Sequence, residues 1–122
     1  MSRTFNRYLY TIWTLKEKYL CVRAVDAAHY MGLFKTSVSI TLRQMREQGL
    51  IETEPDGNLL LTEPGKARSA HLDARVRFFH QLLTEAGVEP SQALQDAISF
   101  SWEMSEAAFE AFRHLYAGAS AE

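Results

Sequence analysis

The sequence predicts a mainly α-helical fold with one small β-hairpin. Over most of the chain, apolar residues recur at steps of three and four, which is the spacing of one face of a helix. This spacing is interrupted once, after Gly49, where two short apolar runs flank the turn residues Pro55-Asp56-Gly57-Asn58. The chain has 122 residues, of which 47% are hydrophobic and 23% charged, as expected for one globular domain or a domain with a helical appendage.

Three helices are predicted before the hairpin, over residues 4–20, 22–31 and 36–48. Gly32 and Gly49 follow the last two and supply helix stops. The positions expected to face the core are Tyr8, Ile12, Leu15 and Tyr19 in the first helix, Val25, Ala28 and Met31 in the second, and Val38, Leu42 and Met45 in the third.

The hairpin is predicted over residues 50–54 and 59–62, because Asp-Gly supplies the positive φ angles of a tight turn. Helical spacing then resumes over residues 62–86, 90–100 and 105–116. We therefore expect two parts, a winged helix-turn-helix DNA-binding domain over residues 1–65 and a helical dimerisation or sensor region over residues 66–122.

In a winged helix-turn-helix, the third helix enters the DNA major groove and the hairpin, called the wing, touches the backbone. Short hydroxyl side chains allow close approach to phosphates, Arg43 or Gln44 could bond base edges, and Ile40 could contact a thymine methyl group. Asn58 is the one neutral polar residue expected at the tip of the wing. The predicted DNA-contacting residues are Arg23, Lys35, Thr36, Ser37, Ser39, Ile40, Arg43, Gln44 and Asn58. The alternative is a winged-helix module that binds protein.

The charge is divided unevenly between the two halves of the chain. Residues 1–50 carry eight Lys or Arg and three acids, a net charge of +5, whereas the remaining residues carry five bases and twelve acids, a net charge of −7. Such a basic segment suits a surface that meets a polyanion. The basic residues expected to share phosphate contacts are Arg3, Arg7, Lys16, Arg23, Lys35, Arg43 and Arg46. The wing should contribute little, because Glu52, Glu54 and Asp56 would repel phosphate.

From about residue 5 to residue 116 the chain resembles the diphtheria-toxin-repressor and manganese-transport-regulator family of bacterial metalloregulators. The segments that carry the resemblance are 8–15, Ser37-Val38-Ser39 with Leu42, Arg43 and Met45, Gly49-Leu50-Ile51, 61–66, Gly87-Val88 and Met104-Ser105. The resemblance implies a homodimeric transcriptional regulator that binds a palindromic operator in double-stranded DNA. It also implies that the helices after the hairpin form the dimerisation part.

Members of that family bind manganese or ferrous iron. The resemblance places the corresponding positions of this chain at Arg7, Tyr10, Val76, Ile98, Ser101 and Trp102. None of these side chains suits a hard divalent cation, which needs carboxylate or imidazole ligands. We therefore expect a metal-independent regulator with no cofactor. The alternative is a manganese- or iron-dependent repressor with a shifted metal site, for which His80 is a candidate ligand.

The second half of the chain is rich in aromatic residues. We expect Phe78, Phe79, Phe100, Trp102, Phe109 and Phe112 to form a dimer interface or an effector pocket, because a short helical segment cannot easily hide so many rings.

Several classes of function are disfavoured. The chain has no Gly-rich phosphate loop, His-Glu-x-x-His helix or Gly-x-Ser-x-Gly elbow, so we do not expect an enzyme. It has no apolar run of about 20 residues and no secretory signal, and its single cysteine, Cys21, cannot form an internal disulfide. We expect a cytoplasmic protein with no membrane partner.

Overall fold

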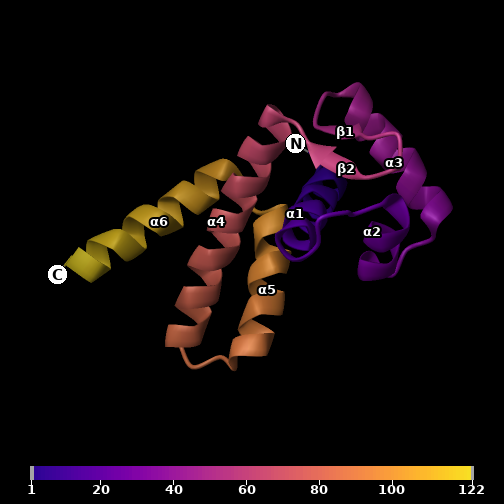
Figure 1. The fold of residues 1–122 in the computed structure, drawn as a ribbon. Helices are drawn as coiled ribbons and strands as arrows, with labels where there is room; N and C mark the ends of the chain where they lie inside the picture. Colours follow the sequence, from indigo (N-terminus) through magenta and orange to yellow (C-terminus); the bar gives the residue numbers. More distant parts are fainter. Residues whose placement is uncertain (1, 122) are drawn as a thin grey trace. The chain divides into compact units, whose positions relative to one another are not determined.

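The structure is a computed structural model that describes the backbone of residues 2–121 and the side chains of residues 2–116. The elements are α1 (Arg3–Lys18), α2 (Ala24–Met31), α3 (Lys35–Glu47), β1 (Ile51–Thr53), β2 (Leu59–Leu61), α4 (Glu63–Glu85), α5 (Pro90–Glu103) and α6 (Glu106–Ala121) (Figure 1). This order confirms the predicted fold class. No helix in the described part of the chain is long and apolar enough to cross a membrane.

The chain divides into two compact units, Met1–His71 and Leu72–Glu122. The division falls inside α4, whereas the sequence placed the boundary at residue 65. The first turns of α4 pack closely on the N-terminal unit, because Gly65 lies against the carbonyl oxygen of Leu50 and the Ser69 hydroxyl donates to the carbonyl oxygen of Leu9 at 3.5 Å.

The core of the N-terminal unit is formed by the inward faces of α1 and α3 together with the hairpin. Its largest fully buried apolar side chains are Leu9, Ile12, Val22, Val38, Leu42, Met45, Ile51 and Leu59. Two expected core residues lie outside it, since Tyr19 is 59% exposed and Val25 is 51% exposed. Tyr19 leaves the helix face because α1 ends at Lys18 and Tyr19 has extended backbone angles.

The turn between α2 and α3 depends on Gly32. This residue has a φ of 68°, which L side chains rarely adopt, and its N–H bonds the carbonyl oxygen of His29 at 3.2 Å. The helix therefore stops at Met31, and α3 begins at Lys35 with Val38, Leu42 and Met45 buried, as the spacing predicted.

The hairpin pairs β1 and β2 antiparallel, with Ile51 opposite Leu61. Asn58, at the end of its turn, is buried rather than exposed at the tip. Its Oδ1 accepts hydrogen bonds from the Val22 N–H at 2.9 Å and from Lys16 Nζ at 3.0 Å, and its Nδ2 donates to Glu54 Oε1 at 2.6 Å. The expectation that Asn58 contacts DNA is therefore wrong, because its amide is used inside the fold.

In the C-terminal unit, the buried guanidinium of Arg75 joins α4 to the turn between α5 and α6. Its Nη1 donates to the carbonyl oxygens of Met104 at 2.7 Å and Ser101 at 3.3 Å, and its Nη2 donates to Glu106 Oε2 at 2.7 Å. At the other end of α4, the Tyr116 hydroxyl donates to Glu85, which lowers the pKa of that carboxyl group.

We predict that Asn58→Ala lowers the free energy of unfolding by about 2 to 3 kcal/mol, because the buried Val22 N–H would lose its partner and Lys16 one of its two acceptors. Urea unfolding followed by circular dichroism measures this loss. Glu47→Gln, at an exposed position, is the control and should change stability by less than about 0.5 kcal/mol. Equal stabilities of the two variants would contradict the role given to Asn58.

We predict that Gly65→Ala destabilises the protein by roughly 3 kcal/mol, although alanine is the better helix former by about 1 kcal/mol. The reason is that a Cβ at this position would overlap the carbonyl oxygen of Leu50. The thermal midpoint of Gly65→Ala should fall well below that of Lys66→Ala, at the exposed neighbouring position of the same helix. A midpoint equal to or above that of the wild type would exclude the close packing of α4 on Leu50.

Candidate nucleic-acid interface

The outward face of α3 is free of contacts that would bury it. Lys35, Thr36, Ser37, Ile40, Arg43 and Gln44 are exposed and Ser39 is partly exposed. Ile40 is 54% exposed although it is apolar, on a helix whose other apolar residues are buried. The structure thus places seven of the nine predicted DNA-contacting residues on one accessible helix face.

Beside this face lies a hollow of about 260 Å³ between α2, α3 and the hairpin, which we call the basic hollow. It is lined by Arg23, Ala24, Val25, Lys35, Ser39, Leu42, Arg46, Thr53, Gly57 and Leu59. Three of these residues are cations and none is an acid. A hollow with this charge attracts an anion such as a backbone phosphate.

Two of the three cations are held in place by hydrogen bonds. The Arg46 Nη1 donates to Thr53 Oγ1 at 3.1 Å, and the Arg23 Nε donates to the carbonyl oxygen of Asp56 at 2.8 Å. The Arg23 side chain also passes close to Gly57, where a Cβ would lie 3.5 Å from its Cδ. Because both arginines bond to the hairpin, the wing orients the cations of the hollow even though its own tip is acidic.

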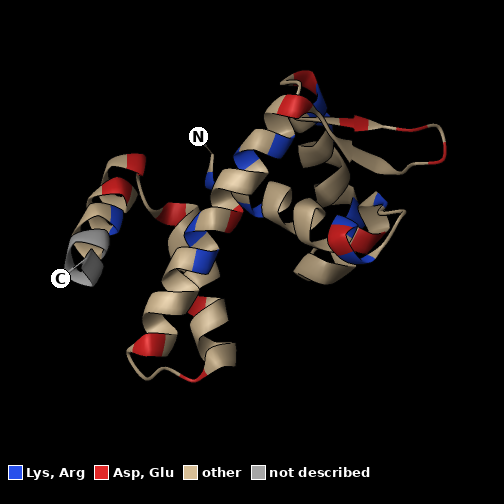
Figure 2. Cartoon of the chain, turned by 60° about the vertical axis from the view of Figure 1, so that its left-hand side comes forward, with Lys and Arg blue, Asp and Glu red and all other residues tan. Residues whose placement is uncertain are grey.

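Other basic residues that were expected to share phosphate contacts are used inside the fold. Arg7 Nη2 donates to the carbonyl oxygen of Met31 at 3.0 Å, and Lys16 Nζ donates to Leu20 and Asn58. Figure 2 shows acidic residues along the hairpin, where Glu52, Glu54 and Asp56 are exposed.

The part of the site that sequence reasoning missed is the hollow itself, with Thr53 as the hydrogen-bond partner of Arg46. A signal for it exists, because Lys35, Ser39, Leu42 and Arg46 follow one another at steps of four, three and four and share one side of α3. Thr53 gives no such signal, since its role depends on how the hairpin packs against α3.

The aromatic residues of the C-terminal unit have two different environments. Phe79 and Phe109 are each only 3% exposed, so these two residues belong to the core of the unit and not to a surface that could form an interface. Phe78 forms edge contacts with both rings, at centroid distances of 5.1 and 5.7 Å. Phe100 and Phe112 contact Phe79 but remain 45% and 46% exposed, while Trp102 is half-buried.

The positions that correspond to metal ligands do not offer a site for a divalent cation. Val76 and Tyr10 are buried, and the Ser101 hydroxyl donates to the carbonyl oxygen of Ala97 at 2.7 Å. Among the described residues there is no group of three or more His, Cys, Asp or Glu side chains that could hold a metal. A ring nitrogen of His80 lies 3.2 Å from the carbonyl oxygen of Pro90. These residues do not fit the metal that the resemblance implies.

The sequence is similar to that of a known transcriptional regulator. The chain is 31% identical over 91 residues to the transcriptional regulator MntR of Escherichia coli O6:H1, an alignment that covers 75% of this chain and 59% of that protein. The chain thus spans less than two thirds of the length of this relative.

Two solved structures share the fold. The metal-dependent transcriptional regulator MtsR matches with a TM-score of 0.80 and 21% identity, covering 95% of this chain and 54% of that chain. A manganese-dependent transcriptional repressor in complex with manganese matches with a TM-score of 0.76 and 25% identity, covering 88% of this chain and 51% of that chain.

The family model for the N-terminal DNA-binding domain of iron-dependent repressors matches residues 1–59. That range contains α1 to α3, β1 and the turn of the wing, which are the elements that build the exposed helix face and the basic hollow. Through residues 1–59, the chain is therefore similar to the N-terminal DNA-binding domain of the iron-dependent repressor family.

Proposed function

We propose that the protein is a homodimeric transcriptional regulator that binds a palindromic operator and needs no metal ion to do so. The observation that carries the DNA-binding part is the basic hollow beside the exposed face of α3. In this proposal α3 lies in the major groove and the hollow receives a backbone phosphate at the groove edge.

The roles of the individual side chains follow from their positions. Arg23, Lys35 and Arg46 line the hollow and contact phosphate, which supplies affinity without sequence preference. Arg43 and Gln44, exposed on α3, reach base edges, and Ile40 contacts a thymine methyl group.

The C-terminal unit supports dimerisation through its exposed apolar side chains. Leu94, Phe100, Phe112 and Leu115 are 42%, 45%, 46% and 73% exposed. Exposed apolar side chains in such number are typical of an association surface. A symmetric pair of α3 helices would then read two symmetric half-sites.

Metal independence is supported by the side chains at the ligand positions. Arg7 would repel a cation, and the buried side chain of Val76 offers no donor atom. In the same unit as Val76, the permanent cation of Arg75 already bonds the turn between α5 and α6. The competing candidate is a manganese-dependent regulator, which is favoured by the similarity to a repressor whose structure holds manganese.

We predict that the protein selects the same palindromic fragments from its source genome with a chelator present and with manganese or ferrous iron added. Sequencing of the bound fragments in parallel arms measures this, and elemental analysis of the purified protein should find no stoichiometric manganese or iron. Selection only in the metal arms would establish a shifted metal site. No selection in any arm would favour a protein-binding module.

We predict that Lys35→Ala weakens binding to selected and random DNA alike, by about fivefold. The fall of log affinity with log salt should also become less steep, by about 1 in slope per protomer. Arg43→Ala should instead lower the preference for the selected fragment, because a base contact contributes about 1 to 3 kcal/mol of discrimination. Fluorescence anisotropy over a salt series separates the two effects. Lys18→Ala, an exposed lysine at the end of α1, is the matched control. Unchanged affinity in both α3 variants would contradict the proposed interface.

A further inference from the structure

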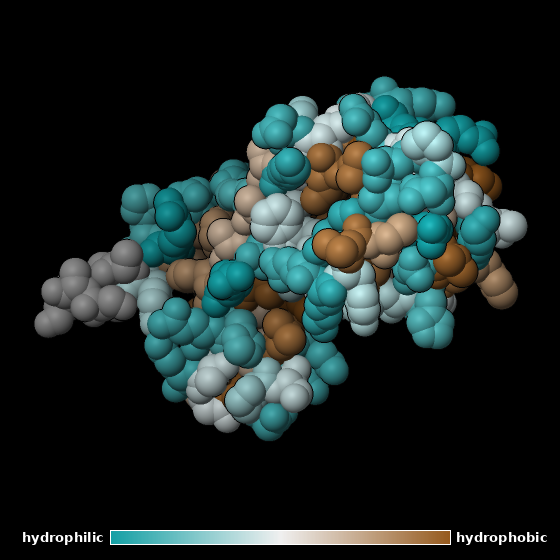
Figure 3. All heavy atoms as spheres, in the orientation of Figure 1, coloured by the Kyte–Doolittle hydropathy of each residue, from teal (hydrophilic) through white to brown (hydrophobic). Residues whose placement is uncertain are grey.

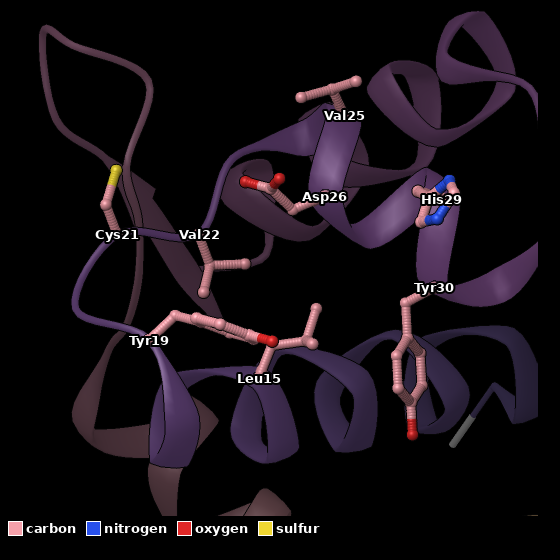
Figure 4. Close-up of a pocket in the computed structure, with 8 residues that line it drawn as sticks. All are labelled: Leu15, Tyr19, Cys21, Val22, Val25, Asp26, His29 and Tyr30. Atoms are coloured by element: carbon pink, nitrogen blue, oxygen red, sulfur yellow. The ribbon is translucent and has the colours of Figure 1, made fainter.

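A second depression in the N-terminal unit lies between the end of α1 and one side of α2. We call it the α1–α2 groove; it is lined by Leu15, Tyr19, Cys21, Val22, Val25, Asp26, His29 and Tyr30 and has a volume of about 450 Å³ (Figure 4). Its size is within the range of small-molecule sites. Figure 3 shows hydrophobic residues that reach the surface at several places among hydrophilic ones.

The apolar character of the groove is not explained by the fold. Tyr19, Val25 and Tyr30 are 59%, 51% and 50% exposed, while Leu15 and Val22 are buried beneath. Helical spacing assigned Tyr19 and Val25 to the core, yet both are exposed. Their exposure beside a depression marks a place where an apolar ligand could shield them from water.

The polar and aromatic groups of the groove favour a positively charged ligand. Asp26 is the single Asp, Glu, Lys or Arg side chain in its lining. Its Oδ2 accepts the Arg23 N–H at 2.8 Å, and no hydrogen bond to Oδ1 is made by the described residues. The aromatic rings of Tyr19 and Tyr30 also favour a cation, because the face of such a ring is electronegative.

We propose that the α1–α2 groove binds a small organic cation with an aromatic body, such as a protonated aromatic amine. The body covers Leu15 and Val22 between the two tyrosines, and the ammonium group lies against the Asp26 carboxylate. An anion is disfavoured by the same carboxylate. The site is distinct from the basic hollow, although Val25 contributes to the lining of both.

The test uses the full chain, labelled with nitrogen-15, in the absence of DNA, so that its result does not depend on the proposed function. Tryptamine is the probe, tryptophol the neutral analogue with a hydroxyl in place of the ammonium group, and indole-3-propionate the anionic one. The readout is the shift of backbone amide signals during titration at constant ionic strength. We expect shifts centred on Val25, Asp26, His29 and Tyr30, and roughly fivefold tighter binding of tryptamine than of tryptophol.

Asp26→Asn removes the negative charge but keeps the local fold, because asparagine retains an oxygen that can accept the Arg23 N–H. This variant should bind tryptamine and tryptophol equally. Asp56→Asn, an exposed position on the wing, should keep the wild-type preference. The proposal is overturned if no compound binds at millimolar concentration, if the shifts lie elsewhere, or if Asp26→Asn keeps the preference for tryptamine.

Discussion

The arrangement of the N-terminal unit depends on the buried side-chain amide of Asn58. Its oxygen holds the backbone of Val22 and the ammonium group of Lys16, and its nitrogen holds the carboxylate of Glu54. These bonds join the end of α1, the loop before α2 and the wing, which are separated by up to 42 residues in sequence. Arg23 follows Val22 directly, so the same bonds that fix the hairpin also set the position from which Arg23 reaches the basic hollow. The basic hollow is therefore built on an interior polar contact.

The C-terminal unit is likewise held by one buried side chain that makes several hydrogen bonds, and here that side chain is charged. Arg75 is 5% exposed, and its guanidinium bonds two carbonyl oxygens and one carboxylate at the junction of α5 and α6. It also lies over the Phe109 ring, 5.1 Å from the centroid. The Nη1 and Nη2 donors have acceptors while Nε has none, so these two groups and the ring contact hold the turn at Met104 beside Phe109. In each unit, one buried polar side chain thus bonds to a turn of the backbone or to residues beside it.

The sequence was sufficient for the elements and for most of the helix face. Periodicity identifies Val38, Leu42 and Met45 as buried, and most of the remaining positions of α3 are then exposed by geometry alone. Helical spacing wrongly predicts that Tyr19 is buried, because α1 ends at Lys18. The polar character of Asn58 suggested an exposed residue at the tip of the wing, but the residue is buried. A count of aromatic rings likewise does not show that Phe79 and Phe109 are buried and lie against one another. For the basic hollow, helical spacing places Lys35 and Arg46 on one side of α3, but it cannot show that Arg23 and Thr53 join them, because these residues meet only through tertiary packing.

The acidic wing has a kinetic consequence. Glu52, Glu54 and Asp56 are exposed on the hairpin and Lys35 and Arg43 are exposed on α3, so charges of opposite sign lie on two neighbouring parts of the N-terminal unit. A polyanion that approaches the hairpin is repelled, and one that approaches α3 is attracted. For the proposed DNA partner, such a field would raise the fraction of collisions that begin with α3 foremost. In this respect the carboxylates act before any contact is made, by removing unproductive orientations from the encounter.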